Sequence, residues 1–309
     1  MKHVFVVNPH AGYHGCTTTI TKMVEAYANT HSDFQYHIYH TQCPGDATRW
    51  VRQYCTEHNQ EAKRFYACGG DGTINEVLTG LMHQPNCQLS CLAFGSGNDF
   101  IKYYGTHADF NDLERLVEGT THLVDVMQVT DSHSAIHYSI NVCNFGFDAE
   151  VVRHMERVRR YPIIGGNNAY TTGIVLGLFG GMRTPINMQV DGNPFYEGDI
   201  LLCAMSNGRN YGGNYCCAPH AQNDDGLIDI GLFRPMSVFT LARLIGSYTD
   251  GSHLQHPAAK KYIRQCQCKR IDLQSRKPFW MAVDGELIED TRFEIENIHH
   301  ALTFVSPRK

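Results

Sequence analysis

Residues 65–77, FYACGGDGTINEV, form the stretch that decides the fold of this chain. The run Phe65–Cys68 is apolar, two glycines interrupt it, and apolar residues then recur at helical spacing from Ile74 to Leu81. This order predicts a strand, a tight glycine turn and a helix.

The first turn of such a helix is suited to phosphate. Its backbone N–H groups lack partners and lie at the positive end of the helix dipole. Glycines carry no Cβ, so a phosphate can approach those donors closely. The same turn can also serve only to pack a helix against a strand. Asp71 lies between the glycines, where its charge would repel phosphate unless a cation or a substrate hydroxyl intervenes. A carboxylate placed at such a turn therefore favours phosphate chemistry over a purely structural role.

Strand, loop and helix alternate four times within about the first hundred residues. Predicted strands at Val4–Val7, Phe34–Thr41 and Leu89–Phe94 accompany the central one, with helices at Thr17–Tyr27 and after Pro44-Gly45-Asp46. This alternation is typical of an α/β, doubly wound parallel sheet with helices on both faces. Its loops, rich in Gly, Asn, Thr and Ser, would meet at the carboxyl edge and hold a nucleotide phosphate.

From about His122 the pattern changes to consecutive strands, so we place a domain boundary near residue 122. Short turns between strands favour a mainly antiparallel, β-rich second domain at 123–299. Residues 300–309 include a strand-like run, Ala301–Val305, that could return to the first domain. The expected strands are Leu123–Val129, Ile136–Cys143, Asn187–Val190, Phe195–Met205, Leu227–Phe233, Arg270–Gln274, Phe279–Val283 and Arg292–Glu296, and the expected helices are Asp148–Arg160, Asn168–Phe179 and Ser237–Tyr248.

The composition is that of an ordinary globular protein. Of 309 residues, 42% are hydrophobic and 18% charged, and the net charge of −5 does not indicate a nucleic-acid partner. Twelve cysteines without zinc-site spacing suggest reduced thiols in a cytoplasmic protein. No apolar run approaches the roughly 20 residues of a membrane span, so any membrane contact is expected to be peripheral.

Several short motifs follow one another in a specific order along nearly the whole chain. Together they resemble the diacylglycerol kinase catalytic family, and specifically its soluble bacterial lipid kinases. The motifs are Asn8-Pro9-His10-Ala11-Gly12, Gly69–Val77, Phe94-Gly95-Ser96-Gly97-Asn98-Asp99-Phe100, Asn144–Ala149, Asn207–Gly213, Ala218-Pro219, Asp225–Asp229 and Val283-Asp284-Gly285-Glu286.

The resemblance implies a phosphofructokinase-like nucleotide domain, a second β-rich domain, a lipid substrate at the membrane surface and a homodimer. It implies ATP phosphates on the Gly69–Asn75 turn, where Thr73 and Asn75 also offer hydrogen bonds. Ser96 stands where relatives commonly carry threonine. Thr41 matches a threonine that contacts the nucleotide in the family; without the resemblance it would be an ordinary strand-end residue. The residues expected to bind the nucleotide are Asn8, Thr41, Gly69, Gly70, Asp71, Gly72, Thr73, Ile74, Asn75 and Ser96.

Phosphoryl transfer needs positioning, Mg²⁺ and a group that accepts the hydroxyl proton. On an extended segment Asp284 and Glu286 would point to the same side, toward one hydroxyl or one metal. The resemblance assigns proton acceptance to Glu286, with Asp284 orienting it or holding catalytic Mg²⁺. Asp71 is the rival base, favoured in eukaryotic relatives. A hairpin turn with solvated acids is the alternative.

The resemblance also implies a structural Mg²⁺ in the segment 222–227. Asp225 would supply the carboxylate, and Gln222 and Leu227 would supply backbone oxygens. Oxygen ligands suit Mg²⁺. Otherwise Asp-Asp-Gly is simply a turn before a strand.

Features on the acceptor side are less specific. The segment Gly165–Gly181 could line an acyl-chain pocket or simply pack. Basic clusters can hold a protein on anionic lipid, although most are ordinary solvated faces. The first cluster is Arg153, Arg157, Arg159 and Arg160, and the second is Lys260, Lys261, Arg264, Lys269 and Arg270.

We therefore expect an ATP-dependent lipid kinase of phospholipid metabolism that phosphorylates diacylglycerol or a related glycerolipid. The sequence has no GxxxxGK[ST] P-loop and no protein-kinase signature. One alternative is an NAD kinase-like enzyme, which shares the Gly-Gly-Asp-Gly-Thr turn, although Thr41 and the Ser96–Asp99 loop favour the lipid side. The other is a non-catalytic lipid-binding regulatory protein, against which the joint presence of Asp71, Asp284 and Glu286 argues.

Overall fold

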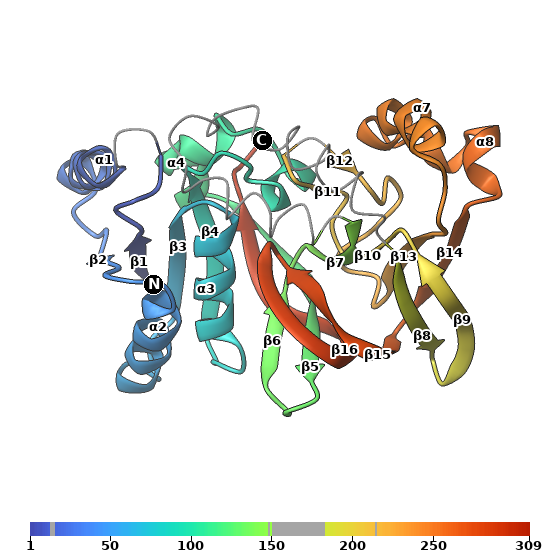
Figure 1. The fold of residues 1–309 in the computed structure, drawn as a ribbon. Helices are drawn as coiled ribbons and strands as arrows, with labels where there is room; N and C mark the ends of the chain where they lie inside the picture. The colour runs from blue at the N-terminus through green and yellow to red at the C-terminus, as the bar shows by residue number, and fades with distance from the viewer. Residues whose placement is uncertain (13–15, 148, 150–182, 214) are drawn as a thin grey trace. The chain divides into compact units, whose positions relative to one another are not determined.

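A computed structural model describes residues 1–12, 16–147, 149, 183–213 and 215–309. The chain forms two compact units, Met1–Val126 with His299–Lys309, and Met127–Ile298 (Figure 1). The expected helices 148–160 and 168–179, the first basic cluster and the 165–181 segment lie outside the described residues, apart from residue 149.

The first unit contains the parallel sheet that the opening stretch predicts. Strand β1 (Lys2–Val7) lies between β2 (Tyr36–His40) and β3 (Lys63–Gly69), and β3 pairs with β4 (Cys87–Ala93), all in parallel. The end of β16 (Glu286–Ser306) adds to β4 through the pair Phe304 and Leu89. All seven residues of β3 are buried, as the central strand of a sheet covered on both faces should be.

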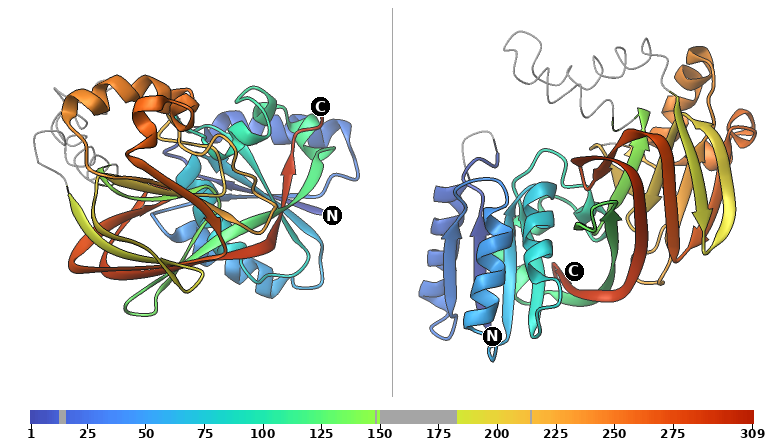
Figure 2. Two further views of the ribbon diagram at one scale, coloured as in Figure 1. Left: turned by 90° about the vertical axis from the view of Figure 1, so that its right-hand side faces the viewer. Right: turned by 60° about the horizontal axis from the view of Figure 1, so that its bottom comes forward.

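Helices flank this sheet, as Figure 2 shows. Helix α2 (Asp46–Glu57) packs against α3 (Asp71–Leu81), and a Cβ on Gly80 would lie only 2.8 Å from the Cβ of Val51, so glycine permits the close approach. The remaining helices are α1 (Thr17–Thr30), α4 (Leu113–Val117) and the 3-10 turns Phe100–Tyr103 and Asp109–Asn111. The α/β fold class is confirmed.

The second unit is built on an antiparallel sheet. Its strands follow the order β14 (Ile263–Cys268), β13 (Ile228–Phe233), β10 (Leu202–Ser206), β7 (Val142–Gly146) and β15 (Arg270–Val283), and β15 pairs with β16. The hairpin of β8 (Thr184–Val190) and β9 (Asn193–Ile200) also pairs with β15. Strands β5 (Thr120–Asp131) and β6 (Ile136–Ser139) pair with each other, and β11 (Asn210–Tyr211) pairs with β12 (Tyr215–Cys216).

Apolar side chains from these strands form one core, which includes Met127, Phe145, Met281 and Phe293. The described residues of this unit include the helical segments α7 (Val238–Thr249), α8 (Pro257–Lys260) and the 3-10 turn Ser252–Leu254. Among the described residues, no helix combines the length and the apolar character needed to cross a membrane. All twelve cysteines are free thiols, as expected.

Candidate active site

The turn after β3 is held by glycines that contact one another across two loops. A Cβ on Gly95, in the loop after β4, would lie 2.3 Å from the Cα of Gly70, and a Cβ on Gly69 would lie 2.3 Å from Oγ1 of Thr73. Neither distance is sterically possible, so the two loops meet only because these residues lack side chains. By contrast, a Cβ on Gly72 would meet nothing within 4 Å, so this side of the first helical turn is open.

Asp71, the first residue of α3, ties the two loops together by hydrogen bonds. Its Oδ1 accepts from the backbone N–H of Asp99 at 2.8 Å and of Phe100 at 3.5 Å. Asn98 adopts φ +47° and donates its side-chain amide to the carbonyl of Gly95 at 2.8 Å. The Asp71 carboxylate therefore organises the loop after β4 in addition to any role toward a ligand.

Side chains from the loops after β1 and β2 and from the starts of α2 and α3 line a pocket of about 200 Å³ in the first unit. Asn8, Thr41 and Thr73, all expected to bind the nucleotide, lie on its wall, and Nδ2 of Asn8 donates to Oγ1 of Thr73 at 3.3 Å. The pocket offers hydroxyl and amide groups, which suit phosphate and ribose oxygens. It is also lined by His10, Gln42, Cys43, Pro44, Ala47 and Glu76.

Glu76 is a wall residue whose position the sequence did not predict. Its Oε1 accepts from the N–H of Gly45 at 3.0 Å, and its Oε2 accepts from the N–H of Ala47 at 3.1 Å. Both donors lie at the start of α2, where backbone N–H groups have no helical partner and favour negative charge. The sequence shows a carboxylate about one turn into α3. Its hydrogen-bond partners lie some thirty residues away, so local sequence does not reveal the contact.

The other expected nucleotide ligands lie outside this pocket wall. Ile74 is 2% exposed, and its N–H donates to the carbonyl of Gly70 at 3.1 Å, so its side chain belongs to the core. Ser96 is exposed in the loop after β4, and Asn75 is half-buried on α3. Gly69 and Gly70 shape the turn, as described above.

The acidic turn of the second unit is a tight hairpin. Val283 pairs with Glu286, and the two residues between them, Asp284 and Gly285, have φ values of +47° and +94°. Positive φ at both central positions is typical of a type I′ turn. The hairpin-turn alternative therefore describes the backbone of this segment, and spacing along an extended strand does not make the two carboxylates face one point.

Asp284 instead accepts hydrogen bonds from the segment 139–142. Its Oδ1 receives Oγ of Ser139 at 2.6 Å, the N–H of Asn141 at 3.1 Å and the N–H of Val142 at 3.0 Å. Its Oδ2 receives the N–H of Ile140 at 2.9 Å. Four donors occupy most of the acceptor capacity of one carboxylate. Asp284 thus fixes the turn, while Glu286 begins β16 with an exposed side chain.

The expected magnesium segment forms a turn before β13. Oδ1 of Asp225 accepts from the N–H of Leu227 at 2.9 Å, and Gly226 has φ +77°. Burial, and then the charge of Asp225, raise the pKa of Asp229, so two carboxylates lie near each other here. Gln222 is exposed. This oxygen-rich set fits Mg²⁺, with Asp225 and the carbonyls of Gln222 and Leu227 as the groups that would hold it.

A second pocket, which sequence reasoning missed, lies under α7 in the second unit. It encloses about 40 Å³ and is lined mainly by apolar and aromatic side chains. Burial lowers the pKa of His253, so this ring is neutral at pH 7. The lining residues are Phe147, Leu202, Tyr211, Tyr215, Phe233, Met236, Leu241, Leu244, Ile245, Tyr248 and His253.

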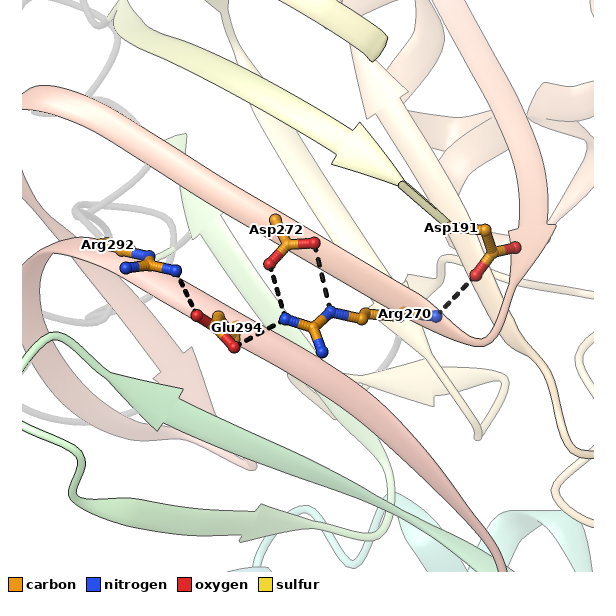
Figure 3. Close-up of polar contacts among 5 residues, drawn as sticks. All are labelled: Asp191, Arg270, Asp272, Arg292 and Glu294. Carbon is orange, nitrogen blue, oxygen red and sulfur yellow. Dashed lines mark hydrogen bonds and ion pairs between the residues drawn. The ribbon is translucent and has the colours of Figure 1, made fainter. Parts of the chain in front are cut away.

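One member of the second basic cluster is neutralised by acids. Nη2 of Arg270 lies 3.1 Å from Oδ1 of Asp272 and 2.7 Å from Oε2 of Glu294, which also pairs with Arg292 (Figure 3). The hydrogen bonds that the Arg270 guanidinium donates to Asp272 raise the pKa of Arg270 further. Since these contacts already balance its charge, Arg270 belongs to a surface ion-pair network rather than to a free basic patch.

Comparison with known proteins identifies the family of the chain. Residues 2–129 match the family described as the diacylglycerol kinase catalytic domain, and residues 141–306 match the YegS C-terminal NAD kinase beta sandwich-like domain. A protein of Alcanivorax borkumensis named "Probable lipid kinase YegS-like" is 27% identical over 85% of this chain and 84% of its own. A protein of the same name from Shewanella frigidimarina is 28% identical over 77% of this chain and 75% of its own.

Solved structures share the fold. A crystal structure of a diacylglycerol kinase from Bacillus anthracis has a TM-score of 0.71 at 21% identity and covers 99% of this chain and 96% of its own. Yeast NADH kinase complexed with NADH has a TM-score of 0.53 at 12% identity, covering 100% and 84%. The fold is thus common to lipid and nucleotide kinases. The two family matches and the names of the relatives together indicate the lipid kinases. The chain belongs to the diacylglycerol kinase catalytic-domain family, among its YegS-like lipid kinases.

Proposed function

We propose that this lipid kinase transfers the γ-phosphate of ATP to the hydroxyl of diacylglycerol or a related glycerolipid at a membrane surface. One observation carries the nucleotide half of the proposal. Asn8 and Thr41, from the loops after β1 and β2, and Thr73, from the first turn of α3, line one pocket. Hydroxyl and amide groups next to a helix N-terminus are suited to binding the phosphates of a nucleotide.

The lipid half of the proposal is supported by the pocket under α7. Its lining is aromatic and aliphatic, and the hydroxyls of Tyr211 and Tyr248 lie 3.1 Å apart beside it. The volume of about 40 Å³ is far below that of a pocket for a whole acyl chain, so these apolar walls would contact only a short hydrocarbon segment. Phe239, which is 89% exposed on α7, offers a further apolar contact for a lipid surface.

In this proposal Glu286 accepts the proton of the lipid hydroxyl as the oxygen attacks phosphorus. Asp284 acts as a positioning residue, because its four hydrogen bonds hold the turn that carries Glu286. The N–H groups at the start of α3, with Thr73, would stabilise charge on the phosphate oxygens. Mg²⁺, when bound, would supply charge neutralisation for the same step.

The test is phosphate transfer from radiolabelled ATP to separate acceptors: diacylglycerol, phosphatidylglycerol, a sphingoid base, undecaprenol and NAD. We expect a labelled glycerolipid. Replacing Glu286 by Gln should lower turnover by orders of magnitude with ATP binding retained. Glu289→Gln, an exposed glutamate on the same strand, is the matched control. Label on NAD alone would favour the nucleotide-kinase alternative, and label on none of the acceptors would favour a non-catalytic lipid-binding protein.

A further inference from the structure

Three potential metal ligands converge in the first unit, away from the motifs discussed so far. They are Asp125 on β5, and His299 and His300 on β16. One ligand atom from each lies within 4.8 Å of the others. Within the described part of the chain, no other group of three His, Cys, Asp or Glu residues meets this condition.

The backbone at His300 brings the two imidazole rings together. Successive side chains of an extended strand point to opposite faces. His300 has φ +52°, in the left-handed region that side chains other than glycine seldom adopt. As a result, the rings of His299 and His300 stack, with centroids 3.6 Å apart and planes at 28°. Uncommon backbone conformations of this kind concentrate at ligand sites.

The third group is a carboxylate that is fully buried. The Asp125 side chain is 0% exposed, whereas that of His299 is 51% exposed. Oδ1 of Asp125 accepts from Nδ1 of His299 at 2.8 Å and from the N–H of His300 at 2.8 Å. A buried anion thus faces two solvent-accessible imidazoles, an arrangement in which a cation can enter from the water side.

We propose that Asp125, His299 and His300 bind a divalent transition-metal ion, with Zn²⁺ as the expected occupant. Two imidazoles and one carboxylate suit Zn²⁺, Co²⁺ and Ni²⁺ and do not suit Mg²⁺ or Ca²⁺, which prefer oxygen ligands. This site is independent of the nucleotide and of the proposed function.

To accept the ion the two imidazole rings must leave their stack, because nitrogen lone pairs lie in the ring planes and nearly parallel planes do not meet at one ion. Zinc bonds of about 2.0–2.1 Å place tetrahedral ligands about 3.3 Å apart, so the 2.8 Å pair of His299 and Asp125 opens slightly. The exposed rings rotate to close the widest separation. The ring proton of His299 resides on Nε2 in the bound form, leaving the Nδ1 lone pair for the metal, and water completes the coordination.

The experiment uses the full chain, without a histidine tag and stripped with a chelator. Titration with Co²⁺ should give visible d–d absorption that saturates at one ion per chain, and Zn²⁺ should abolish it by displacement. Zinc should also raise the midpoint of thermal unfolding to the extent that the assembled site binds it more tightly than the unfolded chain does.

Two variants test the assignment without endangering the fold. His300→Gly keeps a residue that tolerates positive φ, and His299→Gln keeps a donor toward Asp125. Each should weaken Co²⁺ binding by more than the about 10–100-fold typical for loss of an outer-shell partner. His133→Gln, which alters an exposed turn, should leave binding unchanged. The proposal is overturned if no saturable binding occurs, or if binding survives in both variants and disappears only after thiol alkylation, which would assign the ion to cysteines.

Discussion

Replacement of Asp284 by Asn tests the most connected side chain of the acidic turn. Asn tolerates the positive φ of this position, so the change removes charge without adding backbone strain. The amide oxygen can replace Oδ1 and keep the donors from Ser139, Asn141 and Val142. The amide NH₂ then faces the N–H of Ile140, a donor that loses its acceptor.

The magnitude follows from these contacts. Hydrogen bonds to a charged group contribute about 1.5–3 kcal/mol each, and an unsatisfied buried donor costs about 1–3 kcal/mol. Ile140 is 2% exposed, so water does not readily replace the lost acceptor. We expect Asp284→Asn to lower the free energy of unfolding of the second unit by about 2–4 kcal/mol.

The two tryptophans allow this to be measured unit by unit. Trp50 lies on α2 in the first unit, and Trp280 lies on β15 in the second. In a Trp50→Phe background, urea unfolding followed by fluorescence reports the environment of Trp280. The midpoint should fall while the slope stays constant. Glu286→Gln, at an exposed position, should leave the free energy of unfolding within about 0.5 kcal/mol of the parent. A similarly small change for Asp284→Asn, with turnover lost, would refute the positioning role and favour direct contact with metal or substrate.

Three further predictions concern the first unit. Gly95→Ala should destabilise this unit and abolish ATP binding measured by calorimetry, because its Cβ would overlap the Cα of Gly70 at 2.3 Å. Glu76→Gln should lower stability by about 1–2 kcal/mol in denaturant unfolding and weaken ATP binding, because one of the N–H groups of Gly45 and Ala47 loses its acceptor; Glu57→Gln, exposed on α2, serves as control, and equal effects would contradict the role of Glu76. Burial, and then the charge of Arg64, lower the pKa of His3 from 6.5 to about 4. The unfolded chain therefore binds the extra proton first, and stability should fall by about 3 kcal/mol as pH drops from 6.5 to 4, with no further loss from this group below that. His3→Gln should flatten this part of the stability–pH curve, and an unchanged curve would exclude His3 as its cause.

Local patterns were sufficient for much of the fold. The apolar run before Gly69 and the helical spacing after Asp71 are set by neighbouring residues, and β3 and α3 form where they were predicted. Two expected strands at 270–274 and 279–283 are instead one strand, β15, with a register shift between Gln274 and Phe279. Strand β14 was missed because its polar residues, Arg264, Gln265 and Gln267, hide the strand pattern.

The candidate site was less predictable because its contacts join distant parts of the chain. The family resemblance pointed to Asn8, Thr41 and Thr73, and in the structure all three line one pocket, which fits ligand binding at the carboxyl edge of a parallel sheet. No local rule predicts that Gly70 must touch Gly95, or that Glu76 holds the start of α2. Such contacts depend on strand order, which local spacing does not encode.

The acidic turn illustrates how the same residues serve different purposes once strand pairing is known. Spacing alone made Asp284 and Glu286 equivalent acids on one side of a strand. A type I′ hairpin makes them different. Asp284 is one of its two central residues and has no partner across the strand pair, whereas Glu286 pairs with Val283. Asp284 can then turn toward the segment 139–142, whose N–H groups need an acceptor. A proton acceptor must keep an accessible oxygen lone pair, and a carboxylate with four donors has little capacity left. The four hydrogen bonds that Asp284 accepts, rather than its charge or spacing, are the physical reason to assign it a positioning role.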